Sequence, residues 1–228
     1  MGEFDLIRRY FQRPVAAGVE VGVGDDCAVL VPTPGARWLV SSDMLVEGRH
    51  FLSTVDPARL GHKALAVNLS DLAACGATPR GFTLALALPR VDEAWLAGFS
   101  RGLLALADAH GCPLVGGDTT QGPLNICITV FGEAPPGLAL LRGGARVGDE
   151  IWVSGSLGDA RLALEVFRGT VALDGGHFEA VRVAIPRSAS PRAIRGVGHS
   201  IAARTASKWP PSRATVPRNT SSANRASP

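Results

Sequence analysis

Two kinds of apolar pattern alternate along the first 167 residues of this 228-residue chain. Apolar residues three or four positions apart indicate helices that bury one face, and short continuous or alternating apolar runs indicate strands. The helices predicted in this way lie within residues 4–13, 56–76, 92–111 and 160–167. The predicted strands lie within residues 19–23, 27–31, 37–40, 83–88, 114–115, 125–131 and 151–154.

The two longer helices carry recognisable start and stop signals. Asp56 and Asp92 stand at their N-cap positions, and Pro57 occupies the first helical position of one of them. Gly76 and Gly111 follow their last turns, where a left-handed backbone commonly ends a helix. Their apolar residues predict two buried faces, made of Leu60, Ala64, Val67 and Leu72 and of Trp95, Phe99, Leu103 and Leu106.

Strands and helices mixed at this spacing predict an α/β or α+β fold, in which helices pack on a mixed sheet. The first domain is expected to span residues 1–145. Residues 146–180 are expected to supply the first strand and helix of a second α/β domain that stays incomplete, because the periodicity stops after about Glu179. Residues 181–228 form a third segment, a basic tail of low order.

Charge separates this tail from the body of the chain. Residues 1–180 hold 14 basic and 20 acidic residues, whereas residues 181–228 hold nine basic residues and no acidic one. The net charge of +3 therefore does not indicate a nucleic-acid-binding domain. Three interpretations of the tail stay open: a disordered basic segment, an out-of-frame terminus, and an arm that binds nucleic acid. The scarcity of aromatic residues among the arginines argues against the nucleic-acid arm.

Lysine and cysteine usage excludes several classes of protein. Lys63 and Lys208 are the only lysines, and neither lies in a Walker-type loop or a protein-kinase V-A-I-K motif. The cysteines form no C-x-x-C pair and have apolar neighbours, so we expect reduced core thiols in a cytoplasmic protein. They are Cys27, Cys75, Cys112 and Cys127. Without a signal-peptide pattern or an apolar run of 18 residues, no membrane location is expected.

Small oxygen-bearing side chains stand at the ends of the predicted strands and in one helix. The segments are Gly24-Asp25-Asp26, Ser41-Ser42-Asp43, Asn68-Leu69-Ser70-Asp71 and Gly116-Gly117-Asp118-Thr119-Thr120. One isolated aspartate of this kind is most often a cap or a turn residue. As a set, Asp43 after a strand, Asp71 inside a helix and Asp118 after two glycines indicate a shared site.

The physical cost of such a site indicates what it binds. If Asp26, Asp43, Asp71 and Asp118 converge at about 5 Å, each pair of like charges costs on the order of 3 kcal/mol at an effective dielectric constant near 20. Six such pairs approach roughly 20 kcal/mol, more than the stability of a domain, so bound cations are needed. Oxygen ligands without a His or Cys cluster favour Mg²⁺ over Zn²⁺, and such a site suits the triphosphate of a nucleotide.

Other motifs are weaker. Gly22-Val23-Gly24 begins a G-x-G-x-x-G pattern, but Cys27 stands at the third glycine position. The sequence therefore does not match the dinucleotide-binding fingerprint. The loop from Ser154 to Asp159 fits a tight turn better than a phosphate cradle. His50, just past Asp43, stands out among the five histidines. The others are interpreted as structural or solvated: His62, His110, His177 and His199.

At these residues the chain resembles the thiamine-monophosphate kinase family, in the aminoimidazole-ribotide-synthetase-like superfamily. The likeness covers about residues 2–180, and the motifs follow one another at the spacing of the family. They are Gly2-Glu3-Phe4, GVGDDCA from Gly22, SSDMLVEGRHF from Ser41, KALAVNLSDLAACG from Lys63, Leu84 to Pro89, GGDTTQGP from Gly116, Arg142-Gly143-Gly144-Ala145, and GDEIWVSGSLGD from Gly148. The D-x-S-D-G-L and G-G-E-D-Y motifs of the family have no counterpart in the sequence.

The resemblance implies a homodimeric, Mg²⁺-dependent transferase of thiamine biosynthesis, which uses ATP to convert thiamine monophosphate to thiamine diphosphate. It implies Mg²⁺ ligands at Asp26, Ser41, Ser42, Asp43, Asp71 and Asp118, with Asp43, Asp71 and Asp118 also catalytic. Gly117, Asp118 and Arg142 would contact ATP, and His50 would contact thiamine monophosphate. Two alternatives stay open: an inactive, dimerising ATP-binding domain, and another ATP-using enzyme of the same superfamily.

Overall fold

The computed structural model describes residues 2–149 and, beyond them, residues 158, 161–162, 165–166 and 169–172. The elements follow in the order α1 (Glu3–Tyr10), β1 (Val19–Val21), β2 (Val29–Leu30), β3 (Arg37–Val46), α2 (Pro57–Ala74), β4 (Thr78–Leu88), α3 (Glu93–His110), β5 (Leu114–Gln121), β6 (Asn125–Ala134) and the short 3-10 helix η1 (Arg142–Gly144). The strand predicted at 151–154, most of the helix predicted at 160–167, the Ser154–Asp159 loop apart from Gly158, and the tail lie outside the described residues.

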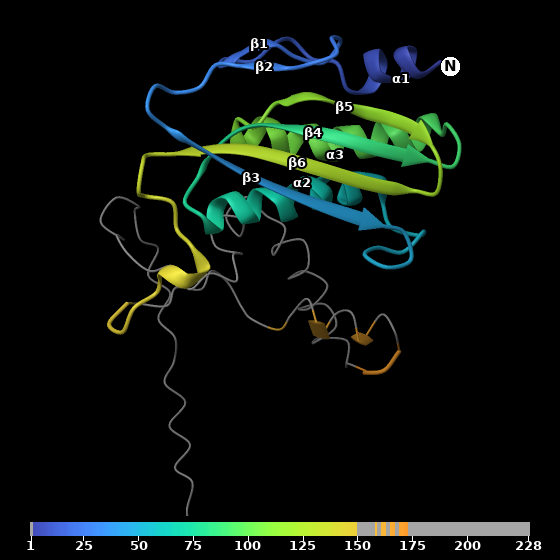
Figure 1. Cartoon of the computed structure of the whole chain (residues 1–228). Coiled ribbons are helices and arrows are strands. Elements are labelled where there is room, and N and C mark those ends of the chain that lie inside the picture. The colour runs from blue at the N-terminus through green and yellow to red at the C-terminus, as the bar shows by residue number, and fades with distance from the viewer. Residues whose placement is uncertain (1, 150–157, 159–160, 163–164, 167–168, 173–228) are drawn as a thin grey trace, which may run out of the picture.

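Four strands form a mixed sheet in the order β3-β6-β4-β5 (Figure 1). β6 runs antiparallel to both of its neighbours, whereas β4 and β5 are parallel and are connected through α3. β1 and β2 pair as a separate two-stranded ribbon, which lies with α1 beside the β5 edge of the sheet (Figure 1). This topology places β3 and β5 at opposite edges of the sheet.

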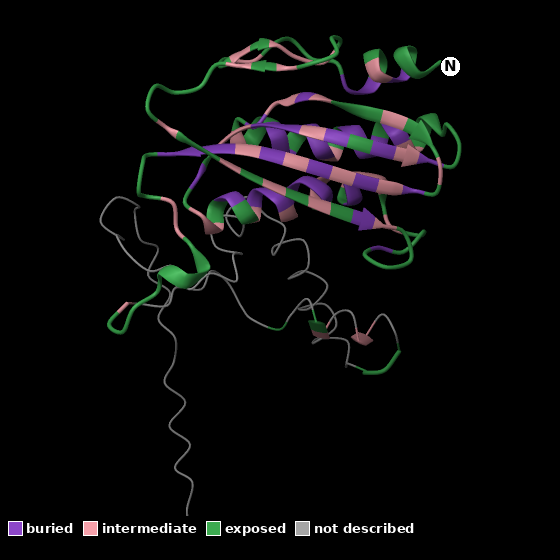
Figure 2. Ribbon diagram, viewed as in Figure 1, coloured by how far each residue is buried: buried purple, intermediate pink, exposed green. Residues whose placement is uncertain are grey.

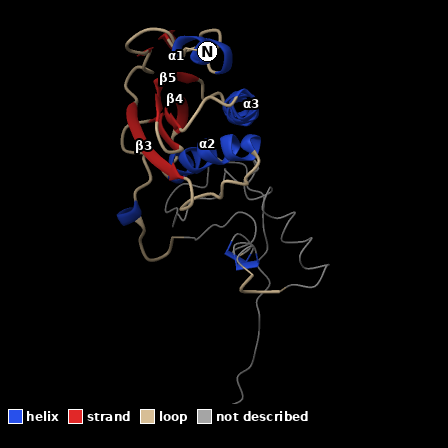
Figure 3. Cartoon of the chain, turned by 90° about the vertical axis from the view of Figure 1, so that its right-hand side faces the viewer, coloured by secondary structure: helices blue, strands red, loops and turns tan. Residues whose placement is uncertain are grey.

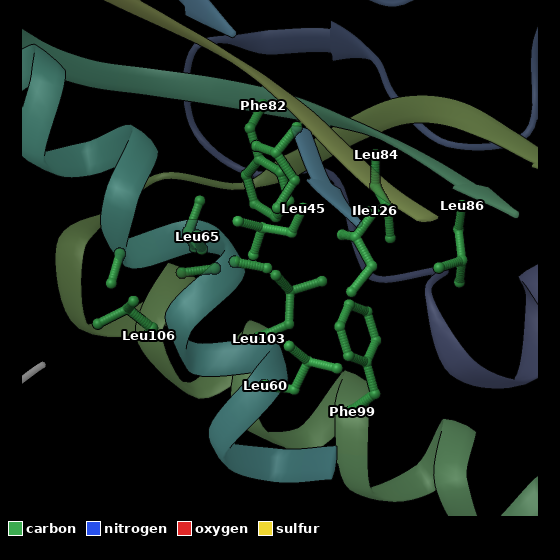
Figure 4. Packing of buried hydrophobic residues seen from close by; sticks show 14 of the residues in the cluster. Leu45, Leu60, Leu65, Phe82, Leu84, Leu86, Phe99, Leu103, Leu106 and Ile126 are labelled. Carbon is green, nitrogen blue, oxygen red and sulfur yellow. The ribbon is translucent and has the colours of Figure 1, made fainter. Parts of the chain in front are cut away.

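Helices α2 and α3 cover one face of the sheet (Figure 3). Side chains alternate along each strand, so every second residue of the central strands faces the helices. These buried residues are Phe82, Leu84, Leu86 and Leu88 of β4 and Ile126, Ile128 and Val130 of β6. They pack against Leu60 and Leu65 of α2 and Phe99, Leu103 and Leu106 of α3 (Figure 4). The opposite face of the sheet carries few fully buried side chains (Figure 2).

The backbones of α2 and α3 approach closely at two glycines. A Cβ atom added at Gly61 would overlap the carbonyl oxygen of Phe99, and one added at Gly102 would overlap the carbonyl oxygen of Ala58. Since each glycine lets the other helix come into backbone contact, the two residues together set the separation of α2 and α3.

A buried carboxylate ties the connection between β2 and β3 to the sheet. Glu133 of β6 is only 4% exposed and accepts hydrogen bonds from the Thr33 backbone N–H (2.9 Å) and from Nε of Arg80 (2.8 Å). Burial by itself raises the pKa of Glu133, but the hydrogen bonds from Thr33 and the Arg80 guanidinium outweigh it, and the pKa lies below its ordinary value. The ionised form therefore stabilises the fold.

The predicted α+β fold with a mixed sheet is confirmed. The helix signals are confirmed in detail, because the Asp56 carboxylate accepts a hydrogen bond from the Arg59 N–H and the Asp92 carboxylate from the Trp95 N–H. Gly76 and Gly111 adopt φ values of +70° and +58°, as expected after a helix. The boundary at residue 145 between two domains stays a prediction.

Several predicted strand limits are wrong. β3, β4 and β5 are each longer than predicted, since they continue through polar and glycine residues whose backbone groups pair with a neighbouring strand. Asp43 and Asp118 therefore lie inside β3 and β5 rather than in loops after them. The ribbon strands β1 and β2 are shorter than predicted.

The prediction of core cysteines holds for Cys112, which is buried, but is wrong for Cys27, which is exposed. Cys75 and Cys127 are partly buried. The apolar residues after Cys27 belong to the small β1–β2 ribbon, which has too few strands to enclose a core. Within the part of the chain that the structure describes, no helix combines the length and the apolar character needed to cross a membrane.

We expect Gly102→Ala to lower the free energy of unfolding by about 1–3 kcal/mol or more, because the added methyl group meets backbone atoms of α2 rather than a flexible side chain. Urea denaturation followed by circular dichroism measures this change. Gly143→Ala is the matched control, since a Cβ atom there meets no atom within 4 Å. Equal stability of the two variants would contradict the close contact of the helices.

We expect Glu133→Gln to destabilise the chain at pH 7 by about 1–3 kcal/mol, because it weakens charge-assisted hydrogen bonds to a buried group. The lowered pKa of Glu133 means that its stabilisation is present above its unfolded pKa and is lost as the pH falls through its folded pKa. The difference between wild type and variant should therefore shrink in acid, as measured by urea denaturation over a pH series. Glu93→Gln removes an exposed carboxylate that pairs with Arg9 and should change little.

Candidate functional site

One group of polar side chains lies between β3 and α2. The Ser41 hydroxyl donates a hydrogen bond to Oδ2 of Asp71 (2.6 Å), and the backbone N–H of Asp43 donates to Oδ1 of Asn68 (3.1 Å). Asn68 is 1% exposed, and its amide group donates in turn to the carbonyl oxygen of Ala64 within α2 (3.0 Å). These bonds fix the end of β3 against the helix, so Asp43 and Asp71 are held near each other.

Local geometry explains which side chains take part. Ser41 and Asp43 are two residues apart on β3 and therefore face the same side, toward α2. Ser42 points to the opposite face, where its hydroxyl lies 2.9 Å from Oγ1 of Thr129 on β6. Asn68 and Asp71 are three residues apart on α2 and so share one side of the helix. The structure thus brings together three predicted metal ligands, Ser41, Asp43 and Asp71, and separates the Ser42 side chain from them.

The charge of Asp43 is disfavoured in this group. Burial raises its pKa, the neighbouring carboxylate of Asp71 raises it further, and His50 opposes both effects. Two carboxylates that repel each other beside a hydroxyl oxygen are the donor set of a hard divalent cation. A cation bound between them would replace the repulsion with attraction.

The segment after β3 carries His50 to the same region. Nδ1 of His50 accepts a hydrogen bond from the Val46 backbone N–H (3.0 Å), and the His50 carbonyl oxygen accepts one from Nζ of Lys63 on α2 (2.6 Å). The imidazole is exposed and is close enough to Asp43 to influence its pKa. His50 is therefore available to a ligand that approaches Asp43.

A second group of polar residues surrounds a pocket at the other edge of the sheet, between α1, the loop after β1, and the strands β4 and β5. Its volume is about 480 Å³, within the usual range for small-molecule sites. Three predicted site residues line it: Asp26, Gly117 and Asp118. The other lining residues are Glu3, Phe4, Ile7, Phe11, Val23, Gly24, Asp25, Leu84, Leu114, Gly116 and Thr119.

Gly117 is required at this edge. Its φ of +150° lies in the region that disfavours other residues, and a Cβ atom there would overlap the carbonyl oxygen of Leu84. The glycine lets β5 pass close to β4 while Asp118 follows at the pocket. Of the two glycines that precede Asp118, Gly117 is thus the one at which the backbones come close.

The two groups are not joined within one chain. β3 and β5 are separated by β6 and β4, so three strand spacings, about 14 Å, lie between Asp43 and Asp118. Among the residues that the structure describes, no three His, Cys, Asp or Glu side chains lie close enough to hold a metal ion. Arg142 is exposed on η1, near the end of α2 where the Leu140 N–H bonds to the Cys75 carbonyl oxygen, and it is not a lining residue of the pocket.

Sequence reasoning assigned no role to Asn68 or Lys63. Asn68 was detectable as an amide within an otherwise apolar helical face, which a buried position tolerates only if its hydrogen bonds are made. Lys63 was detectable as one of only two lysines in the chain, standing eight residues before Asp71 on the same helix. Their partners on β3 and in the His50 segment, however, depend on the tertiary fold.

Comparisons with known proteins show what this chain is similar to. A family model described as AIR synthase related protein, N-terminal domain, matches residues 24–134. The thiamine-monophosphate kinase of Salmonella typhimurium is 52% identical over 169 residues, which cover 73% of this chain and 52% of that protein. The chain therefore spans about half the length of this curated relative.

Two solved structures share the fold. The thiamine-monophosphate kinase from Stenotrophomonas maltophilia superposes with a TM-score of 0.69 at 41% identity, covering 78% of this chain and 58% of that one. AaThiL complexed with AMPPCP and TMP gives 0.61 at 31% identity, covering 71% and 51%. Residues 24–134 thus match the description of an AIR synthase related N-terminal domain, and the chain is similar to the thiamine-monophosphate kinases over part of their length.

Proposed function

We propose that this chain acts in the Mg²⁺-dependent phosphorylation of thiamine monophosphate by ATP, which yields thiamine diphosphate and ADP. The relatives named above support this substrate pair, since AaThiL is complexed with an ATP analogue and TMP. The observation in this chain that carries the proposal is the Asp43–Asp71 pair, which Asn68 and Ser41 hold together although its charges repel. The four free cysteines support a reducing, cytoplasmic location.

The residues fit Mg²⁺ because every proposed ligand offers oxygen. We assign Asp43, Asp71 and Ser41 to the cation at the β3 edge, and Asp26 and Asp118 to a cation at the pocket, with Ser42 a further predicted ligand. When bound, Mg²⁺ would neutralise the phosphate oxygens and align the transferred group. Gly117, Asp118 and Arg142 are proposed to contact ATP, and His50 to contact thiamine monophosphate.

Phosphoryl transfer makes modest demands on the side chains. The acceptor is a phosphate oxygen that is already ionised near neutral pH, so no strong general base is needed. The main tasks are positioning and charge neutralisation. Asp43, Asp71 and Asp118 are proposed to serve these tasks as catalytic residues. The positive charge at the phosphates would then come from the bound cations, so the site does not need lysine side chains.

We propose that the chain functions as a homodimer, formed through the sheet face that α2 and α3 leave open. Trp38, Val40 and Met44 of β3 project from this face and are 41%, 60% and 53% exposed, so they form an apolar strip. The positions of the carboxylates give an independent argument. Because Asp43 and Asp118 lie at opposite edges of one sheet, a second copy offers a way to bring the two groups together.

The proposed domain organisation follows from the same positions. Residues 1–145 supply the carboxylates of both groups and so constitute the ATP- and Mg²⁺-binding domain. Residues 146–180 are proposed to begin a second domain, and residues 181–228 to take no part in the chemistry.

In a test of the proposed activity, we expect the full chain to bind Mg·ATP and to form thiamine diphosphate from thiamine monophosphate, followed by ³¹P NMR. Asp43→Asn and Asp71→Asn should each reduce the rate at least about 100-fold, because a cation ligand at the reacting phosphates is lost. Asp108→Asn, an exposed residue paired with Arg13, is the matched control. Turnover at the wild-type rate in either site variant would contradict the metal assignment.

Removal of the metal gives a second readout of the same pair. The raised pKa of Asp43 means that its ionised form opposes folding, so in EDTA at pH 7 Asp43→Asn should melt at a higher temperature than the wild type. Mg²⁺ should raise the melting temperature of the wild type more than that of Asp43→Asn, which keeps only the proposed ligands at the pocket. Binding of Mg·ATP without thiamine diphosphate formation would favour the inactive ATP-binding domain, and turnover with a different phosphorylated acceptor would favour another enzyme of the superfamily.

We expect Val40→Glu to convert a dimer into a monomer, because it places a charge in the centre of the apolar strip. Sedimentation velocity on both proteins measures the change. Val15→Glu, which also replaces an exposed valine but lies outside the sheet, should remain dimeric. A wild-type chain that is monomeric at all concentrations would refute the proposed interface.

A further inference from the structure

The segment from Glu47 to Phe51, between β3 and α2, is a tight turn that presents His50. The N–H of Gly48 donates to the Phe51 carbonyl oxygen (2.8 Å), and the N–H of His50 donates to the Val46 carbonyl oxygen (2.9 Å). Phe51 is buried and anchors the end of the turn in the core. The backbone of His50 is therefore held by its own segment on one side.

The ring of His50 has a defined hydrogen-bond polarity. Its Nδ1 accepts from the Val46 N–H at 3.0 Å, and a nitrogen that accepts carries no proton. The neutral imidazole must then carry its proton on Nε2. The exposed side of this histidine offers a hydrogen-bond donor, which suits a phosphate oxygen.

Lys63 holds the same residue from the other side. Its Nζ donates to the His50 carbonyl oxygen at 2.6 Å, a charge-assisted bond that joins α2 to the turn. Burial lowers the pKa of Lys63, which is expected for an ammonium group partly removed from water. An ammonium group has three N–H donors, and here one of them bonds to a backbone carbonyl oxygen of the turn.

We propose that Lys63 is a positioning residue: it fixes the turn so that His50 is held as an Nε2–H donor toward a phosphate oxygen of the ligand at Asp43. This inference rests on the proposed function for the identity of that ligand, thiamine monophosphate. It goes further by giving Lys63 a role and by assigning the proton of His50. Since Lys63 lies on the helix that carries Asn68 and Asp71, one helix then positions both the cation ligands and the phosphate donor.

The test compares the wild type with Lys63→Met, which keeps the length of the side chain, and with Lys63→Arg, which keeps the charge. At pH 8, ¹⁵N NMR of the histidine rings identifies which ring nitrogen carries the proton. We expect the Nε2–H form of His50 in the wild type and in Lys63→Arg, and a mixture of both forms in Lys63→Met. Arg59→Met, one turn earlier on α2, is the control and should resemble the wild type.

Binding gives the second measurement, by calorimetric titration of the full chain with thiamine monophosphate and Mg²⁺. We expect Lys63→Met to weaken binding about tenfold, the size of one hydrogen bond to a charged group, and Lys63→Arg to retain most of the affinity. An Nδ1–H form in the wild type, or a Lys63→Met variant with the wild-type ring spectrum and affinity, would overturn the inference. If the wild type does not bind thiamine monophosphate at all, the proposed substrate fails, while the ring spectra still decide the role of Lys63.

Discussion

The backbone contact between α2 and α3 is the constraint on which the candidate site depends. Gly61 and Gly102 allow the two helices to approach until a side chain at either position would overlap a carbonyl oxygen. With the separation of the helices set in this way, the core residues of both helices fill the space beneath the sheet (Figure 4). The position of α2 along β3 is then fixed, and the polar side chains of α2 follow from it.

Three residues of α2 connect this helix packing to the candidate site. Asn68 bonds to the backbone of Asp43, Asp71 accepts from Ser41, and Lys63 bonds to the carbonyl oxygen of His50. Each bond joins the helix to β3 or to the turn that follows it. The arrangement brings two carboxylates together at an electrostatic cost, which is typical of a site that a cation completes.

The order of the strands in the sheet separates two other predicted ligands, Asp26 and Asp118, from the group at β3 and α2. Because β4 and β6 lie between β3 and β5, Asp118 and the pocket that it shares with Asp26 are at the far edge. Within the residues that the structure describes, the predicted ligands therefore form two groups rather than one continuous cluster. The apolar strip on the open face of β3 gives a physical reason why two copies would associate.

Local signals in the sequence predicted the helices well, because caps such as Asp56 and closing residues such as Gly111 act within a few positions of the chain. They predicted β3 and β5 too short, since Ser41 to Asp43 and Gly116 to Thr120 carry no apolar pattern and are held in strands only by their neighbours. For the same reason, local sequence signals could not predict which site residues lie close together.

Asp43 and Asp71 were predicted as ligands from their residue type. Their proximity comes from the packing of α2 against β3, and the separation of Asp118 comes from the order of the strands in the sheet; no local pattern encodes either. Asn68 and Lys63 gain their roles only from contacts with β3 and its turn.

A divalent-cation site formed by Asp43 and Asp71 at the β3 edge can be tested without reference to turnover. Mn²⁺ can replace Mg²⁺ at oxygen ligands and broadens the NMR signals of nearby nuclei. A titration of the ¹⁵N-labelled full chain with Mn²⁺ therefore locates the ion directly. We expect the amide signals of Ser41, Asp43 and Asp71 to broaden first and to recover when excess Mg²⁺ is added. Broadening that spares these residues, or that excess Mg²⁺ leaves unchanged, would rule out a cation site at this pair.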